Sequence, residues 1–149
     1  MNTKKFTILT LWASRVTAVV VLSLIFTLPL LLDWYGDLLG YHPPRRDMTG
    51  IAISFDLCAA AILLALWNVE KLLQNILRKH VFEAENVRRM RRIAICCGVV
   101  AVICLLATFF VLPMLIFAAI MGFLCLAVNV MSCLLDGAVV LREENDLTI

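Results

Sequence analysis

Hydrophobic and polar positions divide the chain into long apolar stretches separated by short charged segments. The four apolar stretches cover residues 16–32, 50–69, 93–112 and 114–135. A helix that crosses a hydrocarbon core of about 30 Å needs about 20 apolar residues, and each stretch is close to that length. The pattern therefore predicts an all-α polytopic membrane protein with four transmembrane helices, in one integral membrane domain that takes up residues 1–149.

The last two stretches form one uncharged run of 43 residues, from Ile93 to Leu135. As a single helix the run would measure about 64 Å, which is roughly twice the thickness of the hydrocarbon core. Pro113 lies inside the run, and proline removes a backbone donor and disfavours helical geometry in the residue before it. We therefore expect the chain to turn back at Pro113, so that the two stretches form a tight helical hairpin.

The positively charged residues predict how the helices are oriented. Only Arg45 and Arg46 lie in segment 33–49, whereas eleven lysines and arginines lie before the first stretch, between the second and third, or after the fourth. Cytoplasmic segments carry an excess of lysine and arginine, so both termini are expected inside and the loop 33–49 outside. A basic start can also indicate a signal peptide, but no small-residue cleavage pattern follows the first stretch, which favours a retained helix.

The composition agrees with a membrane protein and leaves no room for a separate catalytic domain. Hydrophobic residues make up 63% of the chain and charged residues 16%, against about half and about a quarter in soluble domains. All six cysteines lie in apolar stretches, where cysteine acts as a small hydrophobic residue. The adjacent Cys96 and Cys97 are not a CxxC motif and have no histidine nearby. We therefore expect no metal site, no redox site and no cofactor.

Segment 70–92, expected in the cytoplasm, is polar and amphipathic. Its apolar residues recur at helical spacing on both sides of a break near residues 79–82, which predicts one helix that continues the second span and another that leads into the third. Four arginines precede the third stretch: Arg88, Arg89, Arg91 and Arg92. They can attract anionic lipid headgroups at the bilayer surface or dock an acidic protein partner, and we favour lipid.

This segment and the C-terminus resemble a known family. The matching residues are Leu72, Leu73, Asn75 and Ile76; Val81 and Phe82; Glu85 to Arg89 with Arg91 to Ala94; and Glu143 to Ile149. With these motifs and its four apolar stretches, the chain resembles the small bacterial membrane proteins of domain of unknown function 2975. It departs from them at Lys79-His80, where many relatives are expected to have glycine.

The resemblance implies a multi-pass protein of the bacterial cytoplasmic membrane and assigns no activity. Genes of the family often lie beside a gene for a small Cro-like helix-turn-helix regulator. This association implies that the membrane protein senses a signal for the regulator or restrains it. No direct binding of nucleic acid by the membrane protein is expected.

Asp56 is the first polar candidate because ionisable groups inside a membrane span are costly and are often functional. It lies about two turns into the second stretch. We expect it to be buried and paired with Arg45, Arg46 or a neighbouring helix. A structural hydrogen bond between helices is favoured over the binding of a ligand or a proton.

Asn129 and Asp136 are the other polar candidates, on one face of the fourth stretch. Small and polar residues recur there at three- and four-residue steps: Gly122, Cys125, Asn129, Ser132, Cys133 and Asp136. Membrane helices pack through such faces, so packing in the hairpin is the favoured role, helped by the small pairs Ala94/Gly98 and Ala118/Gly122. Asp136 is expected to lie level with Arg88 to Arg92, which predicts an ion pair across the hairpin.

No set of catalytic residues stands out, and by the predicted topology His42 and His80 lie on opposite sides of the membrane. The sequence therefore favours a non-enzymatic membrane protein that acts through protein partners, as a sensor or accessory of a cytoplasmic regulator. The alternative is a small transporter or efflux component that works as a homo-oligomer, with Asp56 and Asn129 along the path. Internal repeats would favour transport, but the loop 33–49 and the turn at Pro113 are too unequal to indicate them.

Overall fold

The computed structural model describes residues 3–39, 45–78, 84–109 and 112–147, which form four helices. In chain order these are α1 (Thr3–Leu39), α2 (Arg45–Leu77), α3 (Ala84–Ala107) and α4 (Met114–Leu147). Each contains an apolar segment long enough to cross a membrane, and the described part of the chain contains no strand. The predicted all-α fold with four membrane-spanning helices is therefore confirmed.

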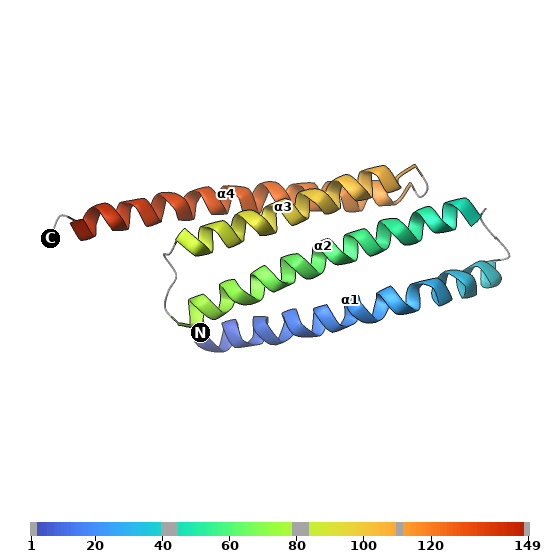
Figure 1. Cartoon of the computed structure of the whole chain (residues 1–149), viewed down its shortest axis with the longest axis horizontal. Coiled ribbons are helices and arrows are strands. Elements are labelled where there is room, and N and C mark those ends of the chain that lie inside the picture. Colours follow the sequence, from blue (N-terminus) through green and yellow to red (C-terminus); the bar gives the residue numbers. More distant parts are fainter. Residues whose placement is uncertain (1–2, 40–44, 79–83, 110–111, 148–149) are drawn as a thin grey trace.

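Consecutive helices lie side by side and run in opposite directions (Figure 1). α1 packs on α2, α2 on α3 and α3 on α4, and within the described residues no other two helices approach closely. The helices therefore form an open row rather than a closed bundle. Two ends are distinguished along the helix axes. We call the end at which α1 begins and α4 ends the terminal end, and the opposite end, where α3 leads into α4, the hairpin end.

The buried core is small and consists of small side chains. Its main cluster comprises Ala61 of α2, Val100 and Cys104 of α3, and Ala118 of α4. A carbon atom added at Gly98 of α3 would lie 3.3 Å from Sγ of Cys125 on α4, so the glycine permits the close approach of these two helices. α3 lies at the centre of this cluster because it packs against both α2 and α4, the other two helices that contribute to it.

The turn of the predicted hairpin lies around residues 109–114, as expected, between the end of α3 and the start of α4. α3 ends at Ala107, five residues before the predicted end of the third stretch at residue 112. The N–H of Leu115 donates to the carbonyl of Leu112, and the N–H of Ile116 donates to that of Pro113, so Pro113 lies where α4 begins. Hydropathy identifies residues that tolerate the membrane, but it does not separate the last helical turn from the residues that reverse the chain.

The helices also extend into the loop predicted at 33–49, because α1 continues to Leu39 and α2 begins at Arg45. Charged residues mark where a chain leaves the hydrocarbon, whereas a helix continues until a residue breaks it. Pro43 and Pro44 of the predicted loop lie outside the described residues. At the terminal end α2 continues to Leu77, as the amphipathic pattern predicted, and the predicted break near 79–82 also lies outside the described residues.

Candidate functional site

The four arginines in the first half of α3 separate into two pairs. Arg89 and Arg92 line a groove between α2 and α3. Arg88 and Arg91 do not line it, and both are exposed. With 3.6 residues per turn, successive helical residues point about 100° apart, which is why adjacent arginines serve different surfaces. We call Arg89 and Arg92 the groove arginines, and Arg88 and Arg91 the outward arginines.

The groove has a volume of about 360 Å³ and changes in polarity along its length. Leu64, Trp67 and Asn68 line it from α2, and Ile95 and Cys96 join the groove arginines from α3. The arginines and Trp67 lie nearer the terminal end, because α3 runs away from that end and α2 runs toward it. Leu64 and Ile95 lie one turn deeper. The groove is therefore charged at one end and apolar at the other.

Arg89 is largely buried and keeps one donor without a partner. Its Nη2 donates to Oε1 of Glu85, one turn earlier on α3. Its Nε is buried and has no hydrogen-bond partner. A buried donor of this kind is costly, and in native structures it calls for an explanation such as a ligand. Arg92 is exposed, and within the described residues no ion pair or hydrogen bond engages it.

An ion pair joins α1 and α2 in the half of the helices nearer the terminal end. Nη2 of Arg15 lies 2.7 Å from Oε1 of Glu70, and Nε of Arg15 donates to the same oxygen at 3.1 Å. The Arg15 side chain is 61% exposed, and exposed charge in contact with hydrocarbon would be costly. We therefore place this pair at the interface between hydrocarbon and headgroups.

A contact between α2 and α3 shows that the charged end of the groove lies at the same depth as the Arg15–Glu70 ion pair. Nδ2 of Asn75 donates to Oδ1 of Asn86 at 2.8 Å. Glu70 lies five residues before Asn75 on α2, and Arg91 lies five residues after Asn86 on the antiparallel α3. Glu70 and Arg91 are therefore level, and the charged end of the groove lies at the membrane edge.

Two buried polar residues hold the terminal ends of the helices together, and the sequence indicated them only in part. Asn86 and Ser132 are each 1% exposed, and the hydroxyl of Ser132 donates to the carbonyl of Val87 at 3.4 Å. The spacing of small and polar residues predicts Ser132 on a packing face, and the family motif includes Asn86 without indicating a structural role for it. The available signal for Asn86 was that it is an uncharged polar residue at the start of the arginine segment.

Asp56 is exposed on α2, so the prediction that it is buried between helices is wrong. It lies on the same face of α2 as Ala60, Leu64 and Trp67, which are also exposed. No ion pair or hydrogen bond engages it among the described side chains, which do not include those of Arg45 and Arg46. α2 is apolar on several faces, so its sequence could not show which of them meets α1 and α3.

The predicted packing face of α4 is correct at some positions and not at others. Cys125 and Ser132 face α3, whereas Asn129, Cys133 and Asp136 are exposed. A carbon atom added at Gly122 would meet nothing within 4 Å. The side of α4 that meets α3 is therefore rotated away from Asn129.

The predicted ion pair between Asp136 and the arginines of α3 is absent from the described part of the chain. Asp136 is exposed, and Arg89 pairs with Glu85 on its own helix. The reason is the register of the hairpin. Ser132 contacts Val87, so Asp136, one turn further along α4, lies level with the start of α3 and past the arginines.

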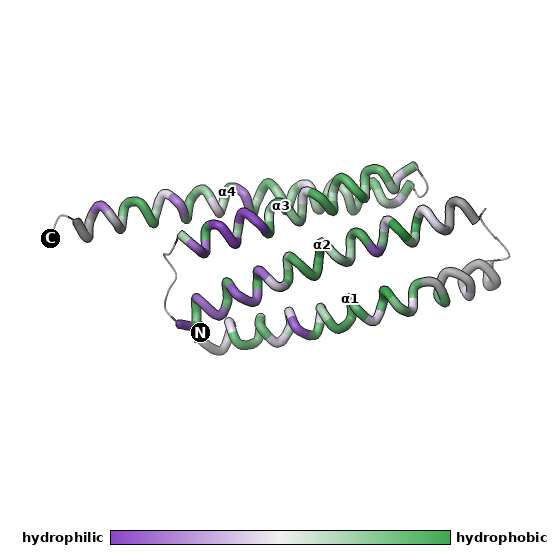
Figure 2. The backbone as a smooth tube through the Cα atoms, in the orientation of Figure 1, coloured by the Kyte–Doolittle hydropathy of each residue, from purple (hydrophilic) through white to green (hydrophobic). Residues whose placement is uncertain are grey.

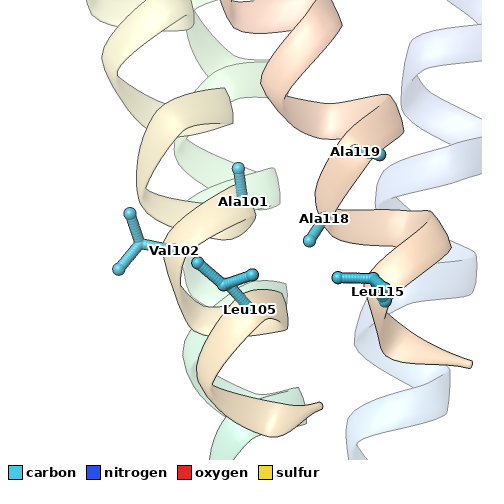
Figure 3. Close-up of a pocket in the computed structure, with 6 residues that line it drawn as sticks. All are labelled: Ala101, Val102, Leu105, Leu115, Ala118 and Ala119. Atoms are coloured by element: carbon cyan, nitrogen blue, oxygen red, sulfur yellow. The ribbon is translucent and has the colours of Figure 1, made fainter. Parts of the chain in front are cut away.

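A second hollow, of about 330 Å³, lies between α3 and α4 near the hairpin end. Six apolar residues line it: Ala101, Val102, Leu105, Leu115, Ala118 and Ala119 (Figure 3). Because no polar side chain lines this hollow, it cannot orient a ligand by hydrogen bonds or charge. Among the described residues no group of three or more His, Cys, Asp and Glu side chains could hold a metal ion, and all six cysteines are free thiols.

Comparison with known proteins gives one match. Residues 11–149 match the model of a family described as protein of unknown function (DUF2975). The matched region includes the arginine segment, the groove and the whole of α4. No curated protein and no solved structure matches the chain.

Proposed function

The chain belongs to the DUF2975 family of proteins of unknown function, and on the basis of its own surfaces we propose that it acts through a protein partner. It is a multi-pass membrane protein, since its four helices are long and apolar enough to span. In the proposal it is non-enzymatic, lies in the bacterial cytoplasmic membrane with both termini inside, and is a sensor or accessory of a cytoplasmic helix-turn-helix regulator.

The observation that carries the proposal is the projection of α4 beyond the other helices at the terminal end (Figure 1). α4 continues for fifteen residues after Ser132, whereas α3 begins three residues before Val87, which Ser132 contacts. At 1.5 Å per residue, about 18 Å of α4 extends past the start of α3. We call this part of α4 the projection.

The projection offers both apolar and charged surface to a partner. Val140 and Leu141 are 50% and 67% exposed, although they lie more than two turns past Ser132, on the aqueous side of the proposed membrane edge. Exposed apolar residues in water favour a protein contact. Arg91 lies level with Glu70 at the proposed membrane edge, and Arg88 lies nearly one turn closer to the projection. Together these outward arginines supply positive charge that complements an acidic partner.

Capture of the regulator by the purified protein tests the proposal. The full chain in mild detergent should retain a small Cro-like helix-turn-helix regulator of the kind encoded beside genes of the family. The double variant Arg88→Glu/Arg91→Glu should lose at least about tenfold in affinity, because like charges then face each other across the contact. Leu141→Glu should have a similar effect through the projection.

A matched control reverses two charges at the other end of α2, as Arg45→Glu/Arg46→Glu. It changes the net charge by the same amount, and capture should stay unchanged. The proposal fails if capture is as strong with both terminal-end variants as with the native chain. It also fails if a reporter fused after residue 149 proves active only outside the cytoplasm.

One observation favours the alternative, transport by a homo-oligomer. Asp56 is an exposed carboxyl group within the apolar segment of α2, where a path between copies of the chain would have to carry polar groups. Asn129 is also exposed, but it lies on α4, which does not approach α2 closely. Asp56→Asn should abolish proton-coupled uptake if the chain transports, and should leave capture of the regulator unchanged.

A further inference from the structure

We propose that the groove between α2 and α3 is a binding site for one anionic phospholipid of the leaflet at the terminal end. The groove arginines, Arg89 and Arg92, would hold the phosphate. The upper parts of the acyl chains would lie against Leu64 and Ile95. This site is separate from the outward arginines, and the inference does not depend on a protein partner.

The polarity of the groove matches that of an amphiphile. Its charged end lies at the membrane edge, level with the Arg15–Glu70 ion pair, and its apolar end points toward the centre of the membrane. Hydrophilic stretches at the end of α2 and the start of α3 lie side by side, and both helices continue as hydrophobic segments (Figure 2). A phospholipid in the bilayer has this order of polar and apolar parts at this depth.

The groove arginines have the donors that a phosphate requires. Nη2 of Arg89 is taken by Glu85, but Nε of Arg89 is buried without a partner. Arg92, nearly one turn further on, also lines the groove. A guanidinium group donates several N–H groups in a planar fork, which binds phosphate oxygens in pairs. A phosphate between the two side chains would satisfy the buried donor of Arg89, which is already paired with Glu85, and neutralise the charge of Arg92.

The aromatic residue beside the arginines fits the same depth. Trp67 lines the groove and is 63% exposed, and Nζ of Lys71 lies 5.5 Å from the centre of its ring. Tryptophan is enriched where the membrane meets water. Lys71 adds a third positive charge near the groove, on the side away from the hydrocarbon.

The position of the groove favours lipid over a water-soluble partner. Leu64 and Ile95 lie on the hydrocarbon side of the membrane edge, where lipid can reach them and an acidic soluble protein cannot. A volume of about 360 Å³ takes a headgroup and the beginning of its chains. The rest of the chains would continue toward the middle of the membrane along the exposed face of α2, as far as Ala60.

Native mass spectrometry of the full chain tests the site. Protein stripped of lipid in neutral detergent is titrated with phosphatidylglycerol or with phosphatidylcholine of the same chains. One phosphatidylglycerol should bind with clear preference. Because each basic residue near the surface contributes roughly fivefold, Arg89→Gln/Arg92→Gln should weaken its binding by roughly 25-fold. The matched variant Arg88→Gln/Arg91→Gln removes the same charge and should change binding less than about twofold.

A second pair of variants keeps every charge, in case loss of the groove arginines prevents folding. Leu64→Trp fills the apolar end of the groove and should weaken phosphatidylglycerol binding at least tenfold. Ile53→Trp, on the same exposed face of α2 but outside the groove, should not. Soluble glycerol 3-phosphate should fail to displace the lipid.

Four results would overturn the proposal. The first is equal weakening by the groove and outward pairs, which would indicate diffuse attraction to the bilayer. The second is equal binding of phosphatidylcholine, and the third is full displacement by glycerol 3-phosphate, which would indicate a site for free phosphate. The fourth is binding of phosphatidylglycerol to the Leu64→Trp variant that is as strong as its binding to the native chain.

Discussion

α1 and α3 have almost equal hydropathy but very different surroundings. Between Ile8 and Leu28 of α1 only Ser14 is buried, whereas seven of the 24 residues of α3 are buried. α3 contacts α2 and α4, while α1 contacts only α2 among the described residues. Hydropathy therefore predicts that a helix enters the membrane, and it does not predict whether the helix packs against protein or lipid.

The difference follows from the sizes of the side chains. The face of α3 in the core contains small residues such as Ala94, Gly98 and Cys104, which let neighbouring backbones approach. The apolar window of α1 contains mostly valine, leucine and isoleucine, and its described link to α2 includes the exposed Arg15–Glu70 ion pair. We expect substitutions to cost most on α3 and least on α1.

Gly98→Val on α3 should have the largest effect. Its added carbon atoms would press on Cys125, already 3.3 Å from a single added carbon, and overpacking of this kind costs about 1–3 kcal/mol. Denaturant titration in detergent micelles would give the free energy of unfolding. Gly122→Val on α4, where an added carbon meets nothing within 4 Å, is the control and should cost little. Equal costs would contradict the close approach at Gly98.

Asn86→Ala should come next, because it removes the acceptor of the Asn75 side chain from a fully buried position. We expect a loss of about 1–2 kcal/mol in the same titration. A double-mutant cycle with Asn75→Ala should show coupling between the two positions. Additive effects would mean that this hydrogen bond does not join α2 to α3.

Ser132→Ala should have a smaller effect. The hydroxyl of Ser132 is buried and donates to the carbonyl of Val87 over 3.4 Å, and hydrogen bonds between membrane helices contribute about 0.6 kcal/mol on average. Cys133→Ala, at the exposed neighbouring position, provides the comparison and should be close to neutral. A larger cost for Cys133→Ala than for Ser132→Ala would mean that the Cys133 side of α4, and not the Ser132 side, packs against α3.

Arg15→Gln on α1 should have the smallest effect, although it removes the ion pair with Glu70. Exposed ion pairs contribute about 0.2–1 kcal/mol and are weakened by salt, so we expect the low end of that range at physiological ionic strength. Unfolding measured at low and high salt checks the expected decrease. A cost above that of Asn86→Ala would reverse the proposed difference between α1 and α3.

The sequence predicts the architecture of this protein better than it predicts the contacts between the helices. The lengths of the apolar stretches and the position of Pro113 predict four helices and the final hairpin, because these features depend on the chain's own composition. The exposure of Asp56 and Asn129 depends on how α2 and α4 rotate about their axes, which is decided by small residues on neighbouring helices. The register that keeps Asp136 away from the arginines follows from the packing of α3 on α4, seen at Ser132 with Val87 and at Cys125 with Gly98.

The separation of the arginines into two pairs on one rigid helix has a thermodynamic consequence. A lipid held by Arg89 and Arg92 would fix the rotation of α3 about its axis, and with it the direction in which Arg88 and Arg91 point. Any partner that binds the outward pair would then favour the same rotation. By linkage, the factor by which the lipid strengthens partner binding must equal the factor by which the partner strengthens lipid binding. Lipid composition would in this way set the affinity of a contact made outside the bilayer.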